Sequence, residues 1–228
     1  MPRWGREGHQ LFRTLVVVVA ALAGSATRSD AHPHVWATVR SEIVFGPDHK
    51  ITGIRHAWTF DEFYTAMAVQ GLDADGDGIY SKAELEPLAK VNVESLEEFD
   101  YFTFVRLDGD DTFLPLKPPV DYWVEFDGTV LTLHFTLPLQ TPLDPRPKDV
   151  DIEVYDPSFF VAFGFAEKVP VKISGTPAAG CTVVVDKPDP ESAEAAKALS
   201  EAFFSQLGPN SSYGSQFAQT MRVKCISQ

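Results

Sequence analysis

The chain is poor in sulfur, with two cysteines and three methionines among 228 residues. Cys181 and Cys225 are far from the C-x-x-C spacing that is typical of thiolate metal sites and redox pairs. In an oxidising compartment an isolated pair most simply forms one disulfide. We therefore expect Cys181 and Cys225 to be bonded to each other.

Positive charge is also scarce. The sequence has 19 lysines and arginines against 32 aspartates and glutamates, a formal net charge of −13. This balance argues against nucleic acid and anionic lipid as partners, because both attract basic surfaces. It fits a protein that handles metal cations.

The common catalytic signatures are missing. The sequence has no G-x-S-x-G elbow, no H-E-x-x-H helix and no phosphate-binding glycine loop. We therefore expect a protein that is not an enzyme. An aromatic cluster near the middle of the second half is most simply part of the core; its members are Phe159, Phe160, Phe163 and Phe165.

Long hydrophobic runs are absent too. The apolar run Leu15–Gly24 has ten residues, whereas a membrane span needs about 20. Arginines precede this run, and small residues at Ser29 and Ala31 follow it, as in a secretory signal peptide over residues 1–31. We expect an exported mature chain with no stable membrane insertion; an uncleaved anchor is the alternative.

The most specific feature that is present is the segment Asp73–Glu84, which matches a twelve-residue EF-hand calcium loop. Gly78 stands at the sixth position, where the loop turns sharply. The alternative is an Asp/Gly-rich surface turn, which gives no reason for a glutamate at the twelfth position. The predicted Ca²⁺ ligands are Asp73, Asp75, Asp77, the carbonyl of Ile79, a water held by Ser81, and bidentate Glu84.

Helical patterns flank this loop. The stripe before it is Phe60, Phe63, Tyr64 and Met67, and the stripe after it is Leu85, Leu88, Leu96 and Phe99. Two residues depart from the usual pattern: Pro87 is expected to kink or shorten the second helix, and Tyr80 replaces an aliphatic side chain. The sequence has a single loop of this kind, and signalling EF-hands usually come in pairs. We therefore expect a structural calcium clamp.

The rest of the chain alternates short β-type segments with Gly/Pro-rich turns. This predicts an α+β protein: an antiparallel, sandwich-like β-rich domain over residues 32–58 and 103–228, with the EF-hand inserted at 59–102. An amphipathic helix is predicted over Glu191–Leu207. The predicted strands are His34–Phe45, Ile51–Trp58, Thr103–Leu107, Asp121–Phe126, Val130–Leu137, Asp149–Tyr155, Phe159–Phe165, Val169–Ser174 and Thr182–Val185.

Two histidines stand at the start of the expected mature chain. Cleavage after Ala31 would leave His32 and His34 close to a free amine, and imidazole is a common ligand for Zn²⁺, Cu²⁺ and Ni²⁺. Pairing about a turn near Asp48 would place His34 opposite Glu62, beside Asp61. This predicts a transition-metal site; the alternative is a solvated terminus with Asp61 capping the following helix.

The other histidines carry weaker signals. His56 shares a strand face with apolar residues, so we expect a packed core histidine rather than a ligand. His134 lies on a threonine-rich face and is expected to be exposed to solvent, and His49 lies in a turn.

Several motifs, taken in order, resemble a proteobacterial family of unknown function that is labelled the periplasmic component of an uncharacterised ABC-type transport system. The resemblance covers nearly all of the mature chain and implies a periplasmic location and a link to nickel, cobalt or zinc transport. The motifs are His32–Trp36, Trp58–Glu62, the EF-type loop, Val91–Leu96, Asp121–Trp123, Leu133–Pro138 and Val154–Pro157.

We therefore expect an exported metal-binding protein that holds Ca²⁺ and serves transport of Ni²⁺, Co²⁺ or Zn²⁺ beside a membrane permease. This chain lacks the two-lobed βα pattern of an ordinary substrate-binding protein, so such a role would be accessory. One alternative is a calcium-dependent interaction module. Another is an enzyme with copper bound at the N-terminal histidine.

Overall fold

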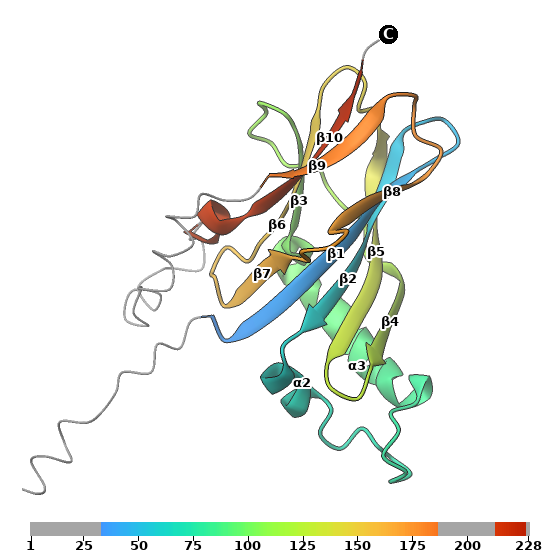
Figure 1. Ribbon diagram of the computed structural model, residues 1–228, viewed down its shortest axis with the longest axis vertical. Coiled ribbons are helices and arrows are strands. Elements are labelled where there is room, and N and C mark those ends of the chain that lie inside the picture. The colour runs from blue at the N-terminus through green and yellow to red at the C-terminus, as the bar shows by residue number, and fades with distance from the viewer. Residues whose placement is uncertain (1–32, 187–212, 227–228) are drawn as a thin grey trace, which may run out of the picture. The chain divides into compact units, whose positions relative to one another are not determined.

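The described part of the protein, residues 33–186 and 213–226 of a computed structural model, contains two β-sheets and two α-helices, which confirms the α+β class (Figure 1). The expected signal segment and the expected helix over Glu191–Leu207 lie outside these residues. The division into a β-rich domain and an EF-hand insertion stays a prediction. The elements are β1 Val35–Phe45, β2 Ile51–Phe60, α2 Glu62–Ala68, α3 Lys82–Ser95, η1 Leu96–Phe102, β3 Thr103–Leu107, β4 Val120–Phe126, β5 Leu131–Leu143, β6 Val150–Val154, β7 Val161–Phe165, β8 Val171–Gly175, β9 Cys181–Asp186, η2 Tyr213–Phe217 and β10 Gln219–Cys225.

The larger sheet has the order β4-β5-β2-β1-β7, with β8 also paired to β1, and the smaller sheet has the order β3-β6-β10-β9. Most strand pairs are antiparallel, as predicted, but β7 and β8 depart from the prediction because they run parallel to β1. Strand β7 pairs with the first half of β1 and β8 with the second half, so the two short strands together form one interrupted edge of the sheet. The interruption lies at Val169 and Pro170, where Val169 has a φ of 49° and proline has no N–H to give to a ladder.

The β1–β2 hairpin is offset by one residue from the predicted pairing. Ala37 lies opposite Phe60, so the two strands do not place His34 opposite Glu62. The cause is a shift of register between Val44 and Phe45, since an extra residue on one strand displaces every later pair. The pairing ends at Phe60, and Asp61 then begins the next element.

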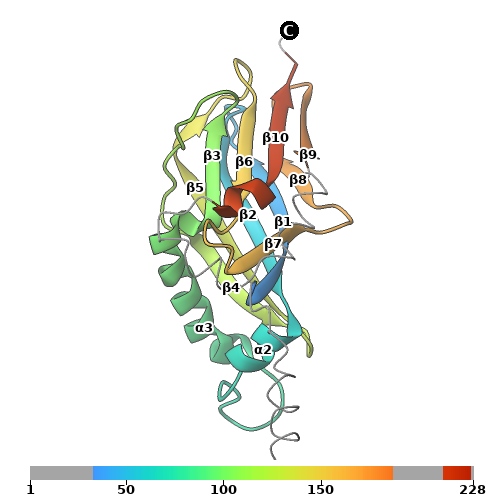
Figure 2. The ribbon, with the colours of Figure 1, turned by 90° about the vertical axis from the view of Figure 1, so that its left-hand side faces the viewer.

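One hydrophobic core is shared by both sheets and by α3. The second sheet covers one part of the larger sheet's inner face, and α3 covers the part beside β4 and β5 (Figure 2). Alternate residues of β1 and β5 are buried, so each of these strands turns one face to this core. The most deeply buried side chains include Val39, Ile43, Ile54, Trp58, Leu133, Phe135, Leu137, Ile152 and Met221.

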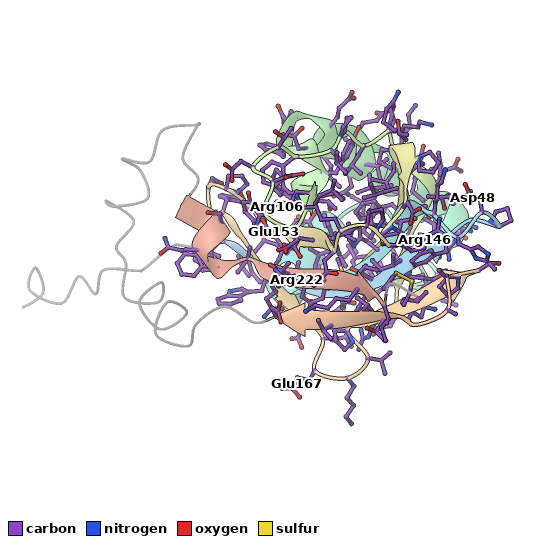
Figure 3. The ribbon with its side chains drawn as sticks, turned by 90° about the horizontal axis from the view of Figure 1, so that it is seen from above. Asp48, Arg106, Arg146, Glu153, Glu167 and Arg222 are labelled. Carbon is purple, nitrogen blue, oxygen red and sulfur yellow. A yellow bond between two sulfur atoms is a disulfide. The ribbon has the colours of Figure 1, made fainter. Side chains whose placement is uncertain are left out.

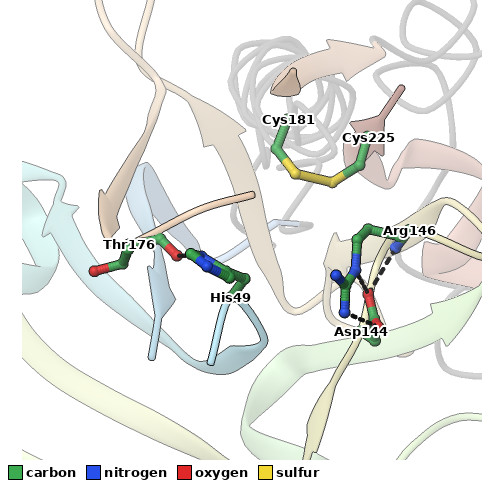
Figure 4. The surroundings of a disulfide bond; sticks show 6 residues. All are labelled: His49, Asp144, Arg146, Thr176, Cys181 and Cys225. Carbon is green, nitrogen blue, oxygen red and sulfur yellow. Dashed lines mark hydrogen bonds and ion pairs between the residues drawn. A yellow bond between two sulfur atoms is a disulfide. The ribbon is translucent and has the colours of Figure 1, made fainter. Parts of the chain in front are cut away.

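Strand β10 was missed in the sequence, although it is a central strand between β6 and β9. Its buried Met221 and Val223 alternate with polar residues, which is the signal that could have identified it. Cys225 at its end lies opposite Cys181 of β9, with a Cα–Cα distance of 4.0 Å. The predicted disulfide between these two cysteines is confirmed (Figure 4).

Ion pairs cross the outer face of the smaller sheet. The guanidinium of Arg222 donates to both oxygens of Asp151, at 2.6 and 3.0 Å. On the other side of β6, Arg106 of β3 pairs with the buried carboxylate of Glu153 of β6 (Figure 3). Burial raises the pKa of Glu153, and the charge of Arg106 opposes that rise. These arginines compensate carboxylates that would otherwise be costly to bury.

His56 is buried at the centre of the larger sheet, which confirms the prediction of a core histidine. Its Nδ1 lies 2.9 Å from the hydroxyl of Ser41, and its Nε2 lies 3.3 Å from that of Thr103. Burial lowers the pKa of His56 to about 3, because the charged imidazolium would lose its hydration. The ring is therefore neutral in the folded protein at neutral pH.

Stability should fall in acid because of this residue. Below pH 6.5, the ordinary pKa of histidine, the unfolded chain takes up a proton that the folded chain refuses down to about pH 3. His56 should thus lower the free energy of unfolding by up to about 1.4 kcal/mol per pH unit across this window. Urea unfolding at a series of pH values measures the slope. His56→Gln should flatten it and the control His134→Gln should not; equal slopes for wild type and His56→Gln would refute the assignment.

Candidate metal centre

Helix α2 leads from the sheet into the acidic loop and begins at Asp61. The Oδ1 atom of Asp61 accepts the backbone N–H of Tyr64 at 2.9 Å, and its Oδ2 atom accepts that of Trp36 at 2.8 Å. One carboxylate therefore caps the helix and fastens it to the start of β1. Farther along, the buried hydroxyl of Thr65 accepts the backbone N–H of Leu131 at 3.1 Å, which joins α2 to β5.

The apolar stripe predicted for this helix does not become a buried face. Phe63 is 72% exposed and Met67 is 56% exposed. The helix has only seven residues, and the contacts of Tyr64 and Thr65 decide which side faces the protein. The helical spacing was correct, but a helix this short buries only one side of one turn.

Helix α3 follows the loop and begins at Ser81 with a capping box. The Ser81 hydroxyl accepts the backbone N–H of Glu84, and the Glu84 carboxylate accepts the backbone N–H of Ser81. The helix continues to Ser95, so Pro87 does not shorten it, and a kink at Pro87 stays a prediction. Leu85, one of three side chains that α3 buries, faces the core, whereas Pro87 lies on the exposed side and costs the helix one backbone hydrogen bond.

Between the helices, side-chain oxygens wind the loop around a common centre. Asp73 accepts the N–H groups of Gly76 at 2.8 Å and of Gly78 at 3.0 Å. Asp77 accepts that of Ile79 at 2.7 Å. Gly78 has a φ of 80°, a conformation that costs glycine little and other residues more. The loop is thus held in its curved form by its own carboxylates.

The carboxylates of Asp73, Asp75 and Glu84 converge, with one oxygen from each lying within 4.8 Å of the others. In residues 33–186 and 213–226 they are the one such group of three or more acidic, histidine or cysteine side chains. Hydrogen bonds from the Ser81 backbone and side chain, with that of the Ala74 backbone, lower the pKa of Glu84. Its side chain is therefore an anion at neutral pH.

This donor set suits a hard divalent cation. It consists of carboxylate oxygens, which Ca²⁺ and Mg²⁺ prefer, and includes neither thiolate nor imidazole. Ca²⁺ takes six to eight oxygens in a flexible shell, whereas Mg²⁺ demands a near-ideal octahedron. The loop is exposed, and its first ligands, Asp73 and Asp75, are separated by one residue. Such a loop fits the flexible shell of Ca²⁺ better than the octahedron of Mg²⁺. Roles for Asp77, Ile79 and Ser81 as further ligands stay predictions; here Ser81 Oγ caps α3.

One contact joins the loop to the sheet, and another joins the two helices that flank the loop. The ring of Tyr80 packs edge-on against Phe126 at the end of β4, with centroids 5.0 Å apart. The hydroxyl of Tyr64 on α2 donates to the side chain of Asn92 on α3 at 3.2 Å. The unusual tyrosine at the eighth loop position therefore supplies an aromatic contact with the sheet.

The predicted N-terminal metal ligands are only partly described, because His32 lies outside the described residues. His34 stacks on Phe160, with centroids 4.6 Å apart, and Asp61 uses both oxygens for backbone N–H groups. Glu62 is exposed in the first turn of α2. Within the described chain His34, Asp61 and Glu62 do not form a converging group, and a site that includes His32 stays a prediction.

The aromatic cluster around Phe160 is divided between core and surface. Phe163 and Phe165 pack against the core as expected, but Phe160 is 47% exposed. Phe159 is half-buried and has a φ of 59°, because the turn that Asp156 organises reverses the chain there. Phe163 and Phe165 lie within β7, two residues apart, so they point to the same face of the sheet and reach the core.

His134 belongs to a constellation that sequence reasoning missed. Its ring stacks on Trp123, with centroids 4.4 Å apart, and its Nε2 lies 3.1 Å from a carboxylate oxygen of Glu125. The expectation of a solvent-exposed histidine is therefore wrong, since its side chain is only 19% exposed. The signal was available in the pairing of β4 with β5, which sets Trp123 opposite His134.

Comparison with known proteins gives one matching family and similar proteins from two organisms. A family model described as "Protein of unknown function (DUF1007)" matches residues 17–225. An "Uncharacterized protein" of Haemophilus influenzae is 25% identical over 196 residues, which cover 86% of this chain and 91% of that protein. An "Uncharacterized 15.5 kDa protein in trpE 3'region" of Spirochaeta aurantia is 28% identical over 104 residues, 46% of this chain and 72% of its own.

The geometry of Asp61 predicts a structural effect that needs no metal. Asp61→Ala should lower the free energy of unfolding by about 1–2 kcal/mol in metal-free buffer, because the helix loses its cap. Asp61→Asn should recover only part of the stability, since its single amide oxygen can cap the helix but its NH₂ group cannot accept the second backbone N–H. Thermal unfolding measures both, with the exposed Glu62→Ala as control. A loss of stability that occurs only when transition metal is present would contradict this role.

Proposed function

This chain belongs to the family described as Protein of unknown function (DUF1007), and we propose that it is an exported calcium-binding protein without catalytic activity. In this proposal one EF-hand-type loop holds Ca²⁺ and fixes the unit α2–loop–α3 on the larger sheet. The single observation that carries the proposal is the convergence of Asp73, Asp75 and Glu84 in a loop of EF-hand spacing.

Calcium would act here as a clamp. Asp73 and Asp75 come from the start of the loop and Glu84 from the first turn of α3, so one ion would join both ends of the loop. Helix α2 is too short to be stable by itself, and it gains most from such a bridge. Affinity in the millimolar range suffices outside the cytosol, where calcium is plentiful.

The periplasm is the proposed location. The Cys181–Cys225 disulfide indicates an oxidising compartment, and the sequence before residue 32 has the pattern of a secretory signal. In the described part of the chain no helix has the length and apolar character to cross a membrane. These features support export to the periplasm.

The calcium clamp is tested by removing one charge from the loop. Isothermal calorimetry on the processed chain should detect one Ca²⁺ site. At a calcium concentration of a hundred times Kd, the free energy of unfolding should rise by about 2.7 kcal/mol, and the melting temperature should rise with it. Glu84→Gln should weaken binding strongly, whereas Glu86→Gln, an exposed residue two positions on, is the matched control. No heat with calcium, and identical melting with and without it, would refute the proposal.

A second proposed function is an accessory role in transport of Ni²⁺, Co²⁺ or Zn²⁺ beside a membrane permease. The observation that favours it is the position of His34, which lies two residues before Trp36, the residue that binds Asp61. The Asp61 carboxylate is thereby bound to the backbone two residues after His34, in an exported chain that would begin with His32. The sequence resemblance to a component of a transport system supports the same role.

Equilibrium dialysis of the processed chain against Zn²⁺, Ni²⁺ and Co²⁺ tests this second function. The wild type should bind one equivalent, and the double variant His32→Ala/His34→Ala should lose it. A His49→Ala variant controls for nonspecific binding to a surface histidine, since His49 lies in the β1–β2 turn. Unchanged binding in the double variant would exclude the N-terminal histidines as ligands.

A further inference from the structure

A groove separates the first half of α3 from the edge strand β4. Its cavity has a volume of about 640 Å³, and an adjoining cavity of about 410 Å³ extends it toward Asp127. Trp123 and Val124 line both cavities. On the helix side the lining consists of Lys82, Ala83, Glu86 and Ala89.

Strand β4 offers unpaired backbone groups along this groove. Within the described chain it pairs only with β5, so its other edge has no neighbouring strand. The N–H and C=O groups of such an edge are a template for a further strand. Val120 and Tyr122 at its start are 45% and 37% exposed.

The form of β4 limits where a strand can be added. Its register against β5 shifts between Val120 and Trp123, and Asp121 has a φ of 50°. A bulge of this kind bends the edge away from a regular ladder. The regular part is therefore Trp123–Phe126, which suits a short extended segment and not a long strand.

The charge around the groove selects among possible occupants. Four carboxylates and one ammonium group line the two cavities, so the groove is acidic. A second copy of this chain would bring the same acidic edge against itself, and like charges on adjacent strands destabilise their pairing. A basic segment would be attracted instead. The charged lining residues are Glu86, Asp121, Glu125, Asp127 and Lys82.

We propose that this groove binds a short, extended, cationic segment of a partner protein, which adds to the Trp123–Phe126 edge as a further strand. Backbone pairing with β4 supplies the alignment, so alternate side chains of the segment lie on opposite faces of the sheet. The basic side chains lie on the helix side, in the cavity beside Ala83 and Glu86, and the apolar side chains lie on the side of Trp123. The proposal does not rest on calcium, although the helix wall of the groove begins in the turn that Glu84 closes.

The test uses fluorescein-labelled ten-residue peptides in which lysine alternates with valine, leucine, phenylalanine or tyrosine. Fluorescence anisotropy with the processed chain should show saturable binding of at least one of them, weakened by added salt. Amide chemical shifts in an NMR titration should change along Trp123–Phe126. A peptide with glutamate in place of lysine should bind at least about tenfold more weakly, because it repels the acidic groove.

Two variants separate the groove from general acidity. Glu86→Lys should weaken binding about fivefold or more, while the same exchange at Glu98, exposed beyond the end of α3, should change it less than twofold. Circular dichroism verifies that both variants fold. A peptide methylated on alternate backbone nitrogens should lose binding, because it cannot donate to β4.

Each contrary result overturns the proposal. These results are no binding of any lysine peptide, equal binding of the glutamate or methylated peptide, and equal effects of Glu86→Lys and Glu98→Lys. Concentration-dependent dimerisation that Glu86→Lys abolishes would assign the groove to a second copy. Repeating the titration with Glu84→Gln distinguishes the two proposals: lost calcium binding with retained peptide binding separates the groove from the calcium clamp.

Discussion

The position of the acidic loop relative to the sheet depends on the carboxylate of Asp61, which connects β1 to helix α2. Its two oxygens are shared between the start of β1 and the first turn of α2, so the chain can leave β2 and turn into a helix while both of these N–H groups stay paired. The same use of carboxylates recurs at Asp156, which accepts N–H groups on both sides of the turn before β7. At both places a carboxylate fixes the backbone by accepting N–H groups from two segments.

The acidic loop was predictable from the sequence because its requirements are local. Asp73, Glu84 and Gly78 are fixed by spacing along one short segment. The pairing of Cys181 with Cys225 was predictable for a different reason, since two cysteines allow only one partner each. None of these inferences required knowledge of which strands are neighbours.

The errors concern relations between distant segments. A single shift of register near Val44 changed the residue that faces each position of β1, and no sequence signal marks it. The parallel pairing of β7 and β8 with β1 depends on the route of the chain through the second sheet. Strand β10 was overlooked because its two buried residues are few, although its neighbours β6 and β9 make it central. His134 is covered by Trp123 from another strand.

The passage from α3 into the second sheet adds a constraint on how the helix can respond to the loop. Asp100, Tyr101 and Phe102 all have positive φ angles, a conformation that costs side-chain-bearing residues on the order of 1 kcal/mol each. The turn is held by the Thr103 hydroxyl, which donates to the Tyr101 carbonyl and contacts the core histidine His56.

Helix α3 is thereby anchored at its far end to the buried core around His56. Its near end is held by the Ser81 cap and by Glu84, a predicted ligand. A helix fixed at one end can change only at the other. An ion in the loop would therefore act on the position of the first turn of α3, and on the groove wall that this turn forms, rather than on the core.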